Sequence, residues 1–118
     1  MSIEDRAKDL GRLIGQSSEY QALKRANDAL AQDHDALGVL RRMEQLRMDA
    51  HRMLEGGQRP TPEMEQELDT LLQTVQVNPT YQRLLVAQEN FDKTMGKVNE
   101  WILDGIERGA ASPIITLG

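Results

Sequence analysis

In the last third of the chain, apolar residues recur at alternating spacings of three and four. This alternation is typical of a helix that packs along one continuous face, as in a heptad repeat. It continues without interruption over residues 78–109 and predicts a single long helix. The positions on the stripe are Tyr81, Leu84, Gln88, Phe91, Met95, Val98, Ile102 and Gly105.

Capping signals mark both ends of this predicted helix. Asn78 can cap the free amide groups of the first turn, and Pro79 suits the first helical position. Gly109 is placed to end the helix in a left-handed conformation, with Pro113 beyond it. At about 1.5 Å per residue the helix is roughly 45 Å long, whereas a compact chain of this size has a radius of gyration of about 13–14 Å. An equally long neighbour, a second copy or another protein must therefore cover part of the stripe.

The first half of the chain predicts two shorter helices and the start of a third. An apolar stripe over residues 3–14 stops at Gly15, and Ser17 or Ser18 can cap a second helix over residues 19–32. The triplet at residues 33–35 interrupts that pattern. Asp33 can cap a new helix there, or the helix can run through, since no Gly or Pro enforces a break; we expect a bend or short turn.

A third apolar stripe runs over residues 36–54 and ends at Gly56 and Gly57. Residues 56–60 form the clearest loop, and Thr61 followed by Pro62 opens a fourth helix rich in glutamate. The expected fold is therefore an all-α bundle of about five helices with long helical hairpins, self-associating through the last helix. Residues 1–109 form one domain, and residues 110–118 a short tail, for which we favour a frayed end over a docking strip.

Composition restricts the chemistry. The 118 residues are 39% hydrophobic but only 3% aromatic, so the core must be largely aliphatic. Cysteine is absent, which excludes disulfides, thiolate catalysis and cysteine-ligated metal or iron–sulfur sites. No signal peptide and no membrane-spanning run is found. We expect a cytoplasmic protein that carries no cofactor and does not insert into a membrane.

The net charge of −5 is unevenly distributed. Residues 1–59 carry ten basic and ten acidic side chains, whereas residues 60–118 carry four basic and nine acidic ones. An acidic second half argues against general nucleic-acid binding, which requires Lys and Arg to displace phosphate counterions. A local exception is an arginine cluster, which we interpret as a solvated helix face that pairs with carboxylates across a hairpin. Its members are Arg41, Arg42, Arg47, Arg52 and Arg59.

No catalytic template fits the chain. It lacks a glycine-rich phosphate loop, a nucleophile elbow and a zinc-binding helix motif. His34 lies between two aspartates, which are a poor ligand set because metal ligands must converge. We interpret His34 and His51 as structural or solvated residues. The sequence therefore predicts a protein that is not an enzyme.

The candidate site is an oligomer or partner interface on the last helix. Asn27 and Gln88 lie where apolar residues are expected; each is either an amide inside a helix interface or a half-solvated residue at its margin. Trp101 is the largest side chain available to anchor a contact, although packing within the bundle is the commoner role. The predicted interface consists of Tyr81, Leu84, Gln88, Phe91, Met95, Val98, Trp101 and Ile102.

These elements together resemble the YlbF/YmcA family of small helical bacterial proteins, including its YheA-like members. The resemblance spans about residues 3–106. It rests on Ser-Ser-Glu-Tyr at residues 17–20, Leu23 and Leu30, the Gly-Gly loop, and Val-Asn-Pro at residues 77–79.

The resemblance implies a self-associating all-α protein that is a non-enzymatic regulator. Characterised relatives act in competence, sporulation and biofilm development, in a complex that adapts a membrane-bound endoribonuclease to its RNA targets. Those regulators use cysteines to hold iron–sulfur clusters, and this chain has none. Cluster binding therefore does not carry over, and the YheA-like branch is the nearer comparison.

Two function hypotheses follow. The first is a regulatory adaptor that contacts a protein such as an RNA-processing complex through the last helix or the tail. The second is a self-assembling structural or chaperone-like protein with no dedicated partner. Within the first hypothesis, we expect Phe91→Asp or Met95→Asp to disrupt assembly, because a charge in a desolvated seam lacks a partner.

Overall fold

The protein is all-α, as predicted. The computed structural model describes residues 2–111, and these contain helices and loops but no strand. The order of the helices along the chain is α1 (Ile3–Gly15), α2 (Ser18–Gln32), α3 (His34–Glu55), α4 (Pro62–Gln76) and α5 (Pro79–Ala110).

Side-chain caps begin the helices where the sequence predicts them. The oxygen of Ser17 accepts a hydrogen bond from the Tyr20 amide, which begins α2. Asp33 accepts from the Ala36 amide at 3.0 Å, so the chain breaks there for one residue, as expected. Thr61 and Asn78 cap α4 and α5 in the same way, each followed by a proline at the first position. Local sequence alone therefore determines where these helices start.

The predicted end of the last helix is wrong by one residue and in its conformation. Gly109 remains helical, α5 ends at Ala110, and Ala111 closes it in a right-handed conformation by donating to the Glu107 carbonyl at 2.9 Å. Within residues 2–111, positive φ occurs only at Gly57, where α3 ends and the predicted loop begins (φ 79°). Of the predicted tail, residues 110–118, Ala110 is the last residue of α5 and Ala111 caps it, whereas residues 112–118 lie outside the described residues.

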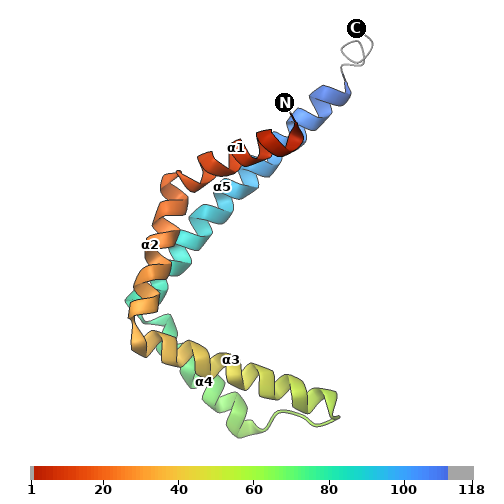
Figure 1. The fold of residues 1–118 in the computed structure, drawn as a ribbon. Coiled ribbons are helices and arrows are strands. Elements are labelled where there is room, and N and C mark those ends of the chain that lie inside the picture. Colours follow the sequence, from red (N-terminus) through yellow and green to blue (C-terminus); the bar gives the residue numbers. More distant parts are fainter. Residues whose placement is uncertain (1, 112–118) are drawn as a thin grey trace.

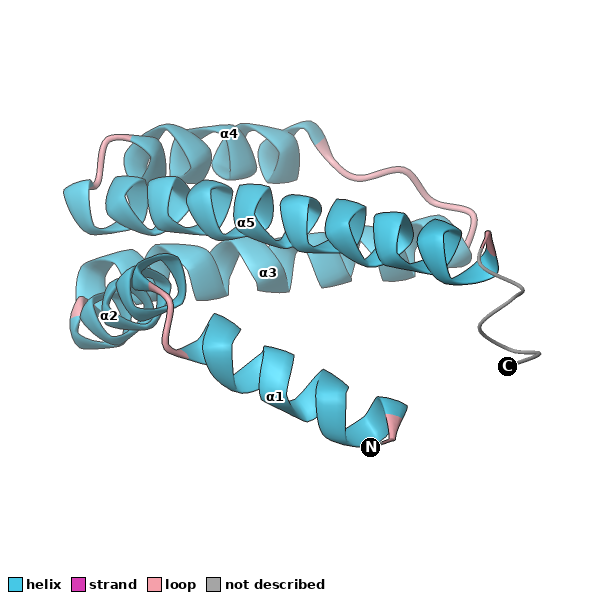
Figure 2. Ribbon diagram, turned by 90° about the horizontal axis from the view of Figure 1, so that it is seen from above, coloured by secondary structure: helices cyan, strands magenta, loops and turns pink. Residues whose placement is uncertain are grey.

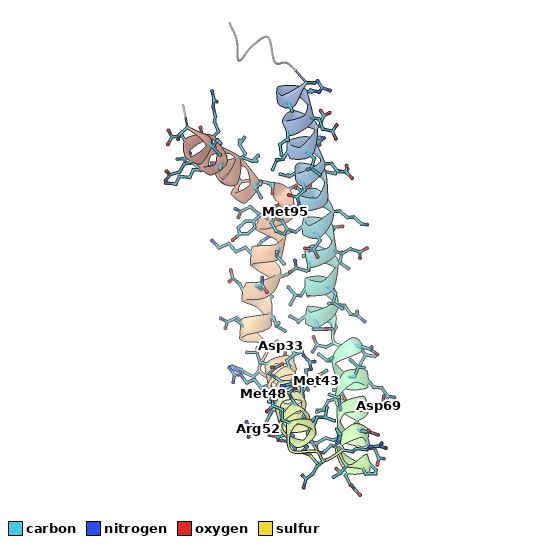
Figure 3. All side chains as sticks on the ribbon, turned by 90° about the vertical axis from the view of Figure 1, so that its right-hand side faces the viewer. Asp33, Met43, Met48, Arg52, Asp69 and Met95 are labelled. Carbon is cyan, nitrogen blue, oxygen red and sulfur yellow. The ribbon has the colours of Figure 1, made fainter. Side chains whose placement is uncertain are left out.

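The helices form two arms that meet at an open angle. In one arm α2 packs antiparallel to α5, and in the other α3 and α4 form an antiparallel hairpin (Figure 1). The first helix, α1, joins the start of α2 and diverges from α5 (Figures 2 and 3). The molecule measures 69 × 37 × 19 Å with a radius of gyration of 21.6 Å. It is far more extended than a compact chain of this length.

The core is correspondingly thin and follows the two helix pairs. In the α2–α5 arm one buried side chain comes from α2 and two come from α5, and in the α3–α4 arm three come from α3 and one from α4. The buried hydrophobic residues of the described chain are Leu23, Ala36, Met43, Leu46, Val75, Ala87 and Val98.

An ion pair joins the two helices of the α3–α4 arm. Arg42 donates to both carboxylate oxygens of Glu67, at 2.7 and 3.1 Å, which confirms the expected pairing across a hairpin. This contact lowers the pKa of Glu67 and raises that of Arg42. Arg47 and Arg52 instead pair with Glu44 and Asp49 on their own helix. The arginine cluster is therefore mostly a solvated face, as interpreted above.

Two helix caps contact each other where the arms meet. The Asn78 side-chain amide donates to Asp33 at 3.3 Å, while each residue also caps its own helix. The Ala36 amide and then the Asn78 amide lower the pKa of Asp33, because they stabilise its charged form. The chain therefore crosses the vertex at two hydrogen-bonded caps.

Candidate functional site

Titratable residues do not converge anywhere in the described chain. Among residues 2–111 there is no group of three or more His, Asp or Glu side chains that could hold a metal ion. His51 pairs with Glu55 on the surface of α3, with 2.9 Å between Nε2 and Oε1. His34 lies at the start of α3, in a shallow polar hollow with Asp33, Asp35 and Thr80. The candidate site is therefore sought among the apolar side chains on the surface of the helices.

The predicted interface residues divide into two groups. We call the face of α5 that contacts α2 its inner face. There Phe91 packs edge-on against Tyr20, with ring centroids 5.6 Å apart, and Val98 is buried. Tyr81, Leu84 and Met95 are half-buried, whereas Gln88, Trp101 and Ile102 are exposed.

Gln88 and Asn27 are both surface residues of the single chain. The Gln88 amide donates to Asp92 at 2.9 Å, one turn further along α5. Ala87 takes the inward position and is buried against α2. A strict heptad drifts by about 20° per repeat relative to a straight helix, so the neighbouring position can rotate into the contact.

The inner face of α5 continues past the end of α2 without a cover. Beyond Val98, Ile102 and Ile106 follow at helical spacing, and Leu103 lies beside them. The exposed fractions of Leu103 and Ile106 are 59% and 60%, unusually high for large aliphatic side chains. We call Ile102, Leu103 and Ile106 the uncovered end. It is uncovered because the chain turns at Gln16 and Ser17, and α1 leads away from α5 (Figure 3).

A groove runs between α2 and α5 on a second face of that arm. Its volume is about 630 Å³, and its surface is mainly apolar. Alanines of α2 and Val86 of α5 line it, with Arg25 and Arg83 at its edges. We call this the α2–α5 groove. Smaller hollows continue it along the arm towards Asn90 and Thr94 in one direction and Thr80 in the other.

Sequence reasoning did not identify the uncovered end in full, nor the groove. Leu103 and Ile106 belong to the apolar pattern of α5, but that pattern does not show where α2 stops. The groove had a signal in Ala22, Ala26 and Ala29, which follow each other at spacings of four and three and therefore share one side of α2. Their small side chains leave room between the two helices.

None of the helices in residues 2–111 combines the length and the apolar content that crossing a bilayer requires.

Comparisons with known proteins agree on one family. A UPF0342 protein of Limosilactobacillus reuteri is 27% identical over 107 residues, covering 91% of this chain and 87% of the relative. One of Streptococcus mutans is 29% identical over 89 residues, covering 75% and 79%. One of Halalkalibacterium halodurans is 24% identical over 112 residues, covering 95% and 97%.

The family model described as "Control of competence regulator ComK, YlbF/YmcA" matches residues 3–107. This range includes all of α1 to α4 and most of α5. The match confirms the resemblance inferred from the capping motifs, and the relatives extend it to UPF0342 proteins. The chain therefore belongs to the YlbF/YmcA family, a regulatory family named for the control of competence.

Proposed function

We propose that this protein is a cytoplasmic, non-enzymatic regulatory adaptor that acts through protein–protein contacts in RNA processing or developmental control. The observation that carries the proposal is the uncovered end, where an inner helix face continues into solvent. Membership of a regulatory family supports the class of function. The uncovered end supplies the surface through which such a regulator would bind another protein.

The surface suits a helical partner. Upstream of Val98 the same face of α5 packs against a helix, α2, so its side chains already form the ridges that a second helix fits. Burying one large aliphatic side chain contributes about 1.5–3 kcal/mol. Three such residues close together on two turns are therefore sufficient to anchor an apolar helix face.

A second candidate function is self-assembly in a structural or chaperone-like role. Its support is the shape of the molecule, which is only 19 Å thick and has few buried side chains. Such a molecule covers little of its apolar surface by itself. In this case the occupant of the uncovered end is another copy, and no heterologous partner is required.

Affinity capture of tagged protein from its native cytoplasm, followed by quantitative mass spectrometry, tests the adaptor proposal. The informative variant is Ile106→Asp, which places a charge in the uncovered end. Its matched control is Met48→Asp, since Met48 is also an exposed apolar residue in a helix but lies on α3, in the other arm. Circular dichroism verifies that both variants remain helical.

The adaptor proposal expects a stoichiometric partner with wild type and Met48→Asp, and at least a tenfold loss of it with Ile106→Asp. Equal recovery with all three proteins would show that the uncovered end is not the binding surface. Recovery of only the protein itself, as a defined oligomer by light scattering, would favour self-assembly instead.

A further inference from the structure

We propose that two copies of this chain pair through the outer face of α5, in antiparallel orientation, with Trp101 of each copy inserted in the α2–α5 groove of the other. This outer face is separate from the uncovered end and does not depend on the adaptor proposal. It follows α5 at spacings of three and four, which place its members on one side of the helix. We call it the outer stripe, and it consists of Arg83, Val86, Asn90, Thr94, Lys97, Trp101 and Asp104.

The outer stripe matches itself when its direction is reversed. A twofold dimer requires that if one residue contacts a second, the second also contacts the first across the interface. Antiparallel pairing about a point between residues 93 and 94 brings Arg83 opposite Asp104 and Val86 opposite Trp101. Opposite charges and apolar side chains therefore meet at both ends of one contact.

The α2–α5 groove can accept the apolar side chain in this match. The exposed fractions of Trp101 and Val86 are 65% and 58%, so both offer apolar area within one chain. The α2–α5 groove lies beside Val86, and its volume of about 630 Å³ is ample for an indole ring over alanine side chains. Large aromatic residues in such grooves commonly anchor protein interfaces.

The charged part is complementary as well. Arg25 and Arg83 border the groove, and neither forms an ion pair within residues 2–111. The segment to be inserted, residues 100–107, carries three carboxylates and no basic residue. Within residues 2–111, Asp104 pairs with Arg108 alone, on the exposed surface of α5 at 3.1 Å. Exposed pairs of this kind are weak, so Asp104 is free to exchange partners.

These matches identify the occupant of the groove as a second copy. Arg83 and Val86 at the groove, and Trp101 and Asp104 in the acidic segment, lie on one helix, so antiparallel pairing brings each pair opposite the other pair in a second copy. The paired stretch, residues 83–104, is about 33 Å long at 1.5 Å per residue. An unrelated acidic helix could fill the groove and pair with its arginines, but it would leave Trp101 of this chain exposed.

Charge reversal tests the pairing. Arg83→Asp and Asp104→Arg should each raise the dissociation constant of the dimer at least tenfold in sedimentation equilibrium, and the double variant should recover most of the loss. The two residues are 21 positions apart in one helix, about 32 Å, so they cannot meet within a chain. Asp92→Arg is the matched control, because Asp92 lies on the opposite side of α5, and it should leave the dimer intact.

Engineered cysteines test the orientation, which is straightforward because the chain has none of its own. A mixture of Asn90→Cys and Lys97→Cys should form a disulfide-linked pair of the two different chains on mild oxidation. Each variant alone should cross-link far less. Both positions are exposed, so the helix tolerates the changes.

Three results would overturn the proposal: a wild-type protein that stays monomeric at high micromolar concentration, a double charge variant as weak as the single ones, or cross-links only between identical chains. Trp101 gives an independent readout, since it is the one tryptophan of the chain. Its fluorescence should shift to shorter wavelength as the dimer forms. Ile106→Asp should not change this shift, which separates the proposal from the adaptor function.

Discussion

The two arms of the molecule are both antiparallel helix pairs, but the paired helices differ far more in length in one arm than in the other. In the α3–α4 arm, 22 residues face 15, and the Arg42–Glu67 ion pair joins the helices near their middle. In the other arm, the 32 residues of α5 pair with the 15 residues of α2. The α3–α4 arm leaves separate apolar side chains exposed, such as Met48 and Leu54, whereas α5 extends past α2 with several exposed apolar side chains close together. This difference is the basis for proposing that the α2–α5 arm makes the contacts with other chains.

The largest expected effect comes from the contact between α2 and α5. Phe91→Asp should lower the free energy of unfolding by about 3 kcal/mol or more, because an uncompensated charge replaces an aromatic packing contact. The comparison variant is Ile102→Asp, which lies on the same face past the end of α2. It should change stability by less than about 0.5 kcal/mol. Urea denaturation followed by circular dichroism measures both.

From the sequence alone, Phe91→Asp is expected to disrupt assembly. Because Phe91 packs against Tyr20 of the same chain, we expect the substitution to destabilise the single chain. If both variants cost the same free energy, α5 is not divided at Val98 into a covered and an uncovered part. The contrast between the arms would then lose its basis.

The next effect concerns the α3–α4 arm. Leu46 is buried there, so Leu46→Ala should cost about 2–3 kcal/mol through lost burial and the cavity left behind. The same measurement on Leu54→Ala, an exposed leucine near the end of α3, should show little change. A loss in fluorescence-detected dimerisation with either variant would contradict the separation of the arms.

A smaller effect is expected at the vertex that joins the arms. Asn78→Ala removes the cap of α5 and the contact with Asp33, and should cost about 1 kcal/mol. Asn78→Asp keeps a good cap but places a second carboxylate beside Asp33. Thermal unfolding should therefore rank the wild type first, with both variants below it.

The smallest effect is a pH dependence. The pKa of Asp33 is lowered in the folded chain, so its contribution is complete above the unfolded pKa and is lost as the pH falls below about 3.8. Asp33→Asn retains a capping side chain but cannot titrate. The stability difference between wild type and this variant should therefore shrink from pH 5 to pH 3. The pKa of Glu67 is also lowered, by its contact with Arg42. Glu67→Gln therefore serves as the parallel control, because it removes a second carboxylate with a lowered pKa.

The sequence predicted local features well. Ser17, Asp33, Thr61 and Asn78 act through hydrogen bonds to residues three positions away, so their roles follow from nearby residues alone. The five helices and the family followed from these caps and from apolar spacing.

What the sequence could not give depends on how helices are placed in space. Ile102 is exposed and Val98 is buried, although both lie on the same predicted seam. The difference arises because α1 leads away from α5, a direction that no spacing on α5 encodes. The inward rotation of Ala87 in place of Gln88 likewise reflects the position of α2. Tertiary arrangement decides which of several similar stripes becomes covered.

The cap-to-cap contact at the vertex also has a consequence for how the chain folds. Asp33 and Asn78 are 45 positions apart, yet they touch because the α3–α4 hairpin returns the chain to its starting point. That hairpin forms from contacts between neighbouring segments, which is fast and carries a small entropic cost. Once it has formed, the last turn of α2 and the first turn of α5 lie next to each other, joined by the Asp33–Asn78 hydrogen bond. The long-range pairing of this arm then proceeds almost as if the two helices were adjacent in sequence.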